Sequence, residues 1–127
     1  MAIKYIILPI QIINMKTILA PTDFSMSSLN AVNYAADLAL AIKAKLVLLH
    51  SIPFPVAVSE ISVPGEFIDN MTESGQRDMD ELYEKIKSRT NDQLSVATVV
   101  SIGTVEQEIE ILSSKERPLA IVMGIRS

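Results

Sequence analysis

Short apolar runs alternate with amphipathic stretches along the 127-residue chain. The first run, over 17–20 and closed by Pro21, is typical of a strand buried on both faces of a sheet. Apolar residues at helical spacing then follow a Ser25 cap as far as Ile42 and predict a helix. A second unbroken apolar run covers 45–50. The chain therefore opens as strand, helix and strand.

The second half of the chain continues this alternation. After an irregular, proline-rich connection over 51–66, apolar residues three or four apart over 68–86 predict a long helix with one buried face. β-Branched residues at 96–101 predict a third strand. A capping box at 104–107 begins another helix, and an apolar run at 119–123 predicts a fourth strand.

The order of the expected elements is β-α-β-α-β-α-β. Strands that alternate with helices of this length predict an open parallel sheet with right-handed crossovers and helices on both faces. We therefore expect an α/β, Rossmann-like fold. It forms one domain over 15–127, which starts at Met15.

Residues 1–14 form an apolar extension in front of this domain. The stretch is too short for a membrane-spanning helix, which needs about 20 apolar residues. It also lacks the small-residue cleavage site of a secretory signal. We therefore predict a cytoplasmic protein with no membrane partner. The extension is expected to pair along the fourth strand, in its own chain or in a neighbour's, because an open strand edge is an aggregation hazard.

The amino-acid composition mainly excludes classes of function. The chain is 49% apolar and 20% charged, which fits a globular domain with a core and excludes disorder. It has no cysteine, so disulfides, thiol nucleophiles and thiolate zinc sites are excluded. One histidine, His50, is too few for a histidine metal cluster. A net charge of −4, from 11 basic and 15 acidic residues, argues against nucleic acid as a partner.

Candidate binding residues follow from the predicted sheet. Ligands of open parallel sheets bind at the carboxyl ends of the strands, where the strand order reverses. Those ends carry P-T-D at 21–23, His50 and Ser51, I-G at 102–103, and G-I-R-S at 124–127. The first strand is not followed by the glycine-rich fingerprint of a dinucleotide site, and no Walker A loop occurs. No catalytic residue and no metal ligand is predicted.

The same residues have structural explanations. Asp23 suits a turn before a helix N-terminus. His50 suits a strand end, where the backbone satisfies it. Gly124 allows the chain to turn out of the sheet.

Three segments in order, M-K-T-I-L-A-P-T-D-F-S, L-V-L-L-H-S-I and I-V-M-G-I-R-S, together resemble the universal stress protein family. The resemblance covers nearly everything from Met15 onward. It implies strand order 3-2-1-4-5, of which this chain holds 3-2-1-4 and lacks the fifth strand. The family's tendency to pair through its last strand implies a homodimer.

The resemblance also implies an adenine-nucleotide site, because nucleotide-binding members hold ATP or AMP over strands one, two and four. The residues that match by position are Pro21, Thr22, Asp23, Ser51, Met123, Gly124, Arg126 and Ser127. The residues at 21–23 would line the nucleoside pocket, Ser51 would meet the adenine edge, and those from Met123 onward would lie beside ribose and phosphates. Ser127 stands where the family signature G-x2-G-x9-G-[ST] has its second glycine, so ATP or AMP is expected to bind weakly or not at all.

Two functions follow from these observations. The first is a stress-response module that binds an adenine nucleotide without catalysis. The alternative is a dimerisation or interaction domain with a degenerate pocket that binds no nucleotide.

Overall fold

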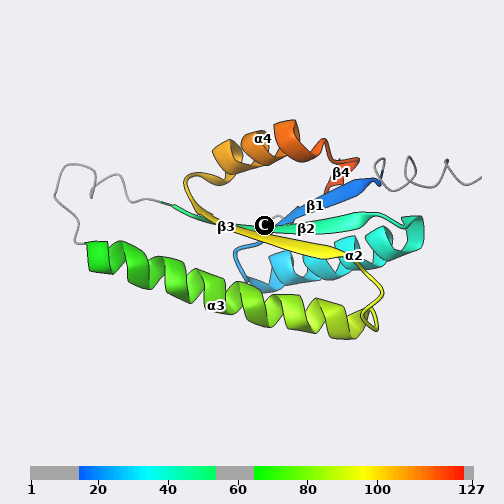
Figure 1. Ribbon diagram of the computed structural model, residues 1–127, viewed down its shortest axis with the longest axis horizontal. Helices are drawn as coiled ribbons and strands as arrows, with labels where there is room; N and C mark the ends of the chain where they lie inside the picture. The colour runs from blue at the N-terminus through cyan, green and yellow to red at the C-terminus, as the bar shows by residue number, and fades with distance from the viewer. Residues whose placement is uncertain (1–14, 54–64, 125–127) are drawn as a thin grey trace, which may run out of the picture.

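A computed structural model describes residues 15–53 and 65–124, which form four strands and three helices (Figure 1). The predicted extension over 1–14 and the predicted site residues Arg126 and Ser127 lie outside the described residues. The elements in chain order are β1 (Thr17–Pro21), α2 (Met26–Ile42), β2 (Lys45–Ile52), α3 (Gly65–Arg89), β3 (Val96–Ile102), α4 (Val105–Glu116) and β4 (Ala120–Ile121). Within this part of the chain, no helix combines the length and apolar character needed to cross a bilayer.

The four strands form one parallel sheet in the order β3-β2-β1-β4, which confirms the predicted fold class and strand order. The first strand is therefore central, with β2 on one side and β4 on the other. Leu19 pairs with Val47 of β2 and with Ile121 of β4. The carboxyl ends of these three strands meet at one edge of the sheet.

The fourth strand is shorter than predicted, with two residues in place of the five expected over 119–123. Backbone hydrogen bonds to β1 reach one residue beyond it on each side, from the Leu119 amide to the Thr17 carbonyl and from the Val122 amide to the Leu19 carbonyl. After Val122 the chain leaves the sheet and runs against the start of α2, as described below.

Helices cover both faces of the sheet, with α2 and α3 on one face and α4 on the other (Figure 1). The larger core cluster lies under α2 and α3, and its fully buried large side chains include Ile18, Leu46, Leu48, Val32, Met79 and Ile86. The smaller cluster lies under α4, where Leu112 packs on Leu19, Val47 and Leu49. Strand residues alternate between the two clusters, as the pleat of a sheet buried on both faces requires.

The helix ends follow the caps that the sequence predicts. Ser25 caps α2, and the Thr104 hydroxyl accepts the Gln107 amide at 3.2 Å while the Gln107 side chain accepts the Thr104 amide at 3.4 Å. These bonds satisfy two amides that the first turn of α4 would leave unpaired. The predicted capping box is therefore present.

An ion pair on the surface joins α2 to α3. Arg89 Nε and Nη2 donate to the two carboxylate oxygens of Asp37, at 3.1 and 2.9 Å. These hydrogen bonds lower the pKa of Asp37. Because both side chains are exposed, the pair adds little to stability.

Candidate functional site

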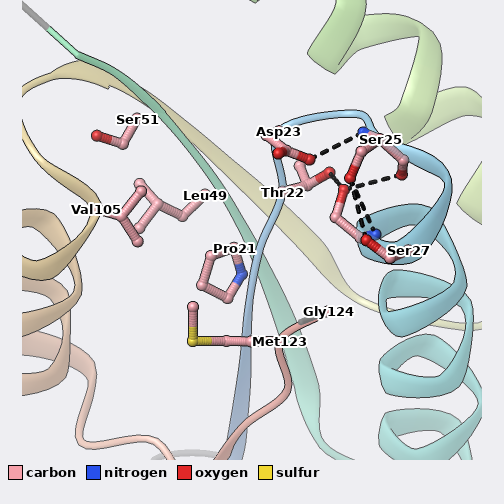
Figure 2. A pocket seen from close by; sticks show the side chains of 11 residues that line it. Pro21, Thr22, Asp23, Ser25, Ser27, Leu49, Ser51, Val105, Met123 and Gly124 are labelled. Carbon is pink, nitrogen blue, oxygen red and sulfur yellow. Dashed lines mark hydrogen bonds between the residues drawn. The ribbon is translucent and has the colours of Figure 1, made fainter. Parts of the chain in front are cut away.

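A pocket opens at the carboxyl edge of the sheet, between α2 and α4 (Figure 2). The structure brings six of the predicted residues together around it: Pro21, Thr22, Asp23, Ser51, Met123 and Gly124. Sequence reasoning missed five further lining residues: Ser25, Ser27, Ser28, Leu49 and Val105. Its volume is about 110 Å³, below the roughly 300–1,000 Å³ of pockets that enclose a drug-sized ligand. A ligand of that size would therefore lie only partly inside it.

Polar and apolar groups line different sides of the pocket. Figure 2 shows the carboxylate of Asp23 and the hydroxyls of Ser25 and Ser27 near the start of α2. The apolar side chains of Pro21, Leu49, Val105 and Met123 lie along the strand ends and α4. Such a pocket suits a flat ligand with an apolar face and polar edges.

Thr22 holds the main chain in place at the pocket. Its amide donates to the Leu49 carbonyl of β2 at 2.8 Å. Its buried hydroxyl lies 2.8 Å from the Ser28 hydroxyl and accepts the Phe24 amide at 3.0 Å. The Thr22 hydroxyl is thus committed to the turn before α2, and its contribution to the pocket is structural.

Asp23 lies exposed at the mouth of the pocket. Its Oδ1 atom accepts the Ser25 amide at 2.9 Å, an Asx turn that fixes the carboxylate against the start of α2. The expected role of Asp23 in a turn before the helix is therefore confirmed. It also leaves the carboxylate on the pocket lining, so the turn and a ligand-binding role are compatible.

Ser51 joins the end of β2 to the turn after β3. Its buried hydroxyl donates to the Gly103 carbonyl at 2.5 Å. The predicted role of Ser51 rested on its backbone, and this hydrogen bond fixes that backbone at the pocket wall.

Gly124 brings the end of the described chain against α2. A Cβ atom at this position would lie 2.4 Å from the Ser27 carbonyl oxygen and 2.8 Å from the Ser28 amide nitrogen. Backbone atoms cannot yield as a flexible side chain does, so this close approach requires glycine. The contact closes the pocket on the side of β4.

The two helix N-termini at the pocket differ in charge. The first turn of α2 contains no acidic residue, whereas α4 carries Glu106 and Glu108 in its first turn and has its capping box. At the start of α2 the negative charge comes instead from Asp23, whose carboxylate accepts the Ser25 amide just before the helix. Among the described lining residues, Asp23 is the one with a charged side chain. A neutral polar ligand fits this lining better than a polyanion.

The parallel sheet covered on both faces, with its pocket at the point where the strand order reverses, defines an α/β protein of the kind that binds ligands at its strand ends. The model of the universal stress protein family matches residues 14–127, and the chain belongs to this family. No curated protein is significantly similar to the chain in sequence.

Solved structures of the family share the fold. A family member from Burkholderia pseudomallei has a TM-score of 0.70 and 23% identity, over 87% of this chain and 81% of that chain. UspA from Lactobacillus plantarum has a TM-score of 0.69 and 20% identity, over 88% and 80%. A universal stress protein in complex with cAMP has a TM-score of 0.60 and 20% identity, over 85% and 75%. At these identities the likeness shows the fold.

Proposed function

We propose that the chain is a stress-response module of the cytoplasm that binds an adenine nucleoside, or weakly its nucleotides, in the pocket between α2 and α4. The observation that carries the proposal is the convergence of Pro21, Thr22, Asp23, Ser51, Met123 and Gly124 on one pocket. The solved relative in complex with cAMP supports the ligand class. Adenine lies against the apolar strand ends, and the Asp23 carboxylate accepts hydrogen bonds from ribose hydroxyls.

The proposed module binds without catalysis. General acid–base or nucleophilic chemistry needs a base within hydrogen-bond reach of its partner. The single histidine directs Nδ1 to the backbone carbonyl of Thr22 and not to a hydroxyl. The pocket hydroxyls of Thr22 and Ser28 bond to each other. These contacts favour a binding role for the site.

Replacing Asp23 by asparagine tests this function. The amide oxygen retains the acceptor for the Ser25 amide, while the charge that strengthens bonds to ribose hydroxyls is removed. We expect adenosine to bind the variant about tenfold more weakly, since a hydrogen bond to a charged group contributes about 1.5–3 kcal/mol. Isothermal titration calorimetry measures the change. Asp80→Asn, at an exposed position on α3, is the matched control and is expected to bind as the wild type does.

Failure of the wild-type protein to bind adenosine at millimolar concentration would contradict nucleoside binding. Equal affinity of wild type and Asp23→Asn would remove Asp23 from the site.

The apolar outer part of β4 favours the second candidate function, a dimerisation domain. Leu119, Ile121 and Met123 alternate along the chain and are 58%, 41% and 47% exposed, while Ala120 and Val122 pack into the larger core cluster. Among the described strands, β4 is at the edge of the sheet beside β1. We propose that two copies pair through this edge as a homodimer, because an apolar edge strand is a template for pairing.

Ile121→Lys tests the homodimer. A charge at the centre of an edge strand opposes pairing, so we expect the variant to be monomeric at concentrations where the wild type is dimeric. Sedimentation velocity measures the oligomeric state. Tyr34→Lys, at a 64% exposed position on α2, is the matched control and leaves the dimer intact. A monomeric wild type, or a dimer that survives Ile121→Lys, would contradict the proposal.

A further inference from the structure

His50 lies near the end of β2 and contacts the turn that leads from β1 into α2. Its Nδ1 atom is 2.9 Å from the carbonyl oxygen of Thr22. A carbonyl oxygen only accepts hydrogen bonds, so Nδ1 is the ring nitrogen that carries the proton. In the neutral ring, Nε2 is then the acceptor. This bond fixes both the tautomer and the place of the imidazole.

The imidazole is held from two further sides. The ring of Phe24 lies with its centroid 4.5 Å from that of His50, at an interplanar angle of 48°. Helix α3 passes the ring at Gly75, where an added Cβ atom would lie 3.2 Å from His50 Cδ2. The position of the ring is therefore set by packing as well as by its hydrogen bond.

The turn that His50 contacts has an unfavourable backbone conformation. Phe24 has φ of 64°, in the left-handed region that a bulky side chain rarely adopts. Such a residue persists where its surroundings hold it. Here the Phe24 amide donates to Thr22 Oγ1 at 3.0 Å and the Phe24 ring rests on His50.

The hydrogen bond from His50 acts on the peptide group that carries Asp23. The Thr22 carbonyl belongs to the peptide bond between residues 22 and 23, so its direction determines where the Asp23 side chain starts. On the other side of Thr22, the amide donates to the Leu49 carbonyl at 2.8 Å. Two consecutive residues of β2 thus hold Thr22, Leu49 through its backbone and His50 through its side chain.

We propose that His50 is a positioning residue for the pocket: its Nδ1–H bond to Thr22 keeps the 22–25 turn in the conformation that presents Asp23 to a ligand. The effect on ligand affinity rests on the proposed function. The effect of His50 on the conformation of the 22–25 turn does not rest on that function, and it is measured in the protein without ligand.

Two substitutions separate the hydrogen bond from the bulk of the ring. His50→Leu has similar bulk and no donor, whereas His50→Asn places an amide N–H near the position of Nδ1. Amide hydrogen exchange at Phe24 and Ser25, followed by NMR, reports opening of the turn. We expect exchange about five- to tenfold faster in His50→Leu and restored toward wild type in His50→Asn, as loss of one hydrogen bond implies. Ile86→Val, which removes one buried methyl group at the far end of α3, controls for general loss of stability.

The tautomer gives a second measurement that needs no variant. The ¹⁵N chemical shifts of the neutral wild-type ring are expected to show the proton on Nδ1. A proton on Nε2 would overturn the proposal, even if His50→Leu failed to fold. Exchange at Phe24 and Ser25 within twofold of wild type in His50→Leu would also overturn it.

Adenosine titration separates the positioning role from the proposed function. We expect His50→Leu to bind adenosine about five- to tenfold more weakly than wild type, with recovery in His50→Asn. If exchange is faster in His50→Leu but its affinity for adenosine is unchanged, the claim that the turn conformation affects ligand binding is contradicted. If the wild type binds no adenosine but exchange is faster in His50→Leu, the proposed function is contradicted. The role of His50 in holding the turn is then still supported.

Discussion

Gly124→Val is expected to lower the free energy of unfolding by about 2–3 kcal/mol, in the range of overpacked sites, and to abolish adenosine binding. A Cβ atom at this position would lie 2.4 Å from the Ser27 carbonyl oxygen, so the chain after β4 has to move away from α2. That movement withdraws Met123 and Gly124 from the pocket wall. Urea unfolding gives the stability change, and calorimetry gives the change in binding.

The matched control is Gly65→Val at the first residue of α3, where an added Cβ atom has nothing within 4 Å. This variant is expected to stay within about 0.5 kcal/mol of wild type, as surface substitutions usually do. A Gly124→Val protein as stable as Gly65→Val, with adenosine affinity unchanged, would show that the contact between residue 124 and α2 does not shape the pocket.

Adenosine is expected to bind at least as tightly as ATP, whose dissociation constant should be millimolar or weaker. Phosphates at such sites are held by backbone amides of a glycine loop and a helix N-terminus. Loss of a single charge-assisted hydrogen bond, at roughly 1.5–3 kcal/mol, weakens binding about ten- to hundredfold.

The charge of the pocket lining also predicts weak binding of ATP. Asp23 is its charged side chain among the described residues, and a carboxylate repels a triphosphate. In the sequence, Ser127 stands where the family signature has its second glycine. Calorimetry with adenosine, AMP and ATP, with and without Mg²⁺, measures the series. Micromolar ATP binding, or affinity that rises with each phosphate, would contradict the prediction.

Local sequence patterns predicted the elements well, because their boundaries have local causes. Apolar runs marked the strands, and Ser25 and Thr104 capped helices where expected. The strand order 3-2-1-4 could not be predicted from these local patterns, because periodicity does not specify which strands are neighbours. It came from the resemblance of three short segments to a family. The two-residue length of β4 was missed, since it depends on how the chain at Gly124 approaches Ser27.

The candidate site was predicted in part, because ligands of such sheets bind at strand ends and the strand ends can be located from the sequence. It pointed to residues 21–23, Ser51 and the chain after the fourth strand. Ser27 and Ser28 were missed because Ser25 was interpreted only as a cap, although three serines in four residues directly follow P-T-D-F. Val105, at the start of α4, was missed as well and is 36% exposed at the pocket.

The contact of His50 with Thr22 was beyond sequence reasoning. The two residues lie 28 positions apart, and each belongs to a different strand end. The expectation that the backbone satisfies His50 was confirmed, but no pattern in the sequence identifies which carbonyl it bonds. Long-range contacts of this kind are set by strand register, here Pro21 opposite Leu49.

The most direct test of the central claim is an NMR titration of the ¹⁵N-labelled protein with adenosine. Binding in the proposed pocket predicts saturable shifts of the amide signals of Thr22, Asp23, Ser51 and Gly124, while amides just beyond the C-terminal end of α3, such as Thr90, stay unchanged. No shifts at millimolar adenosine, or shifts confined to residues outside the pocket, would contradict the claim that this pocket binds an adenine nucleoside.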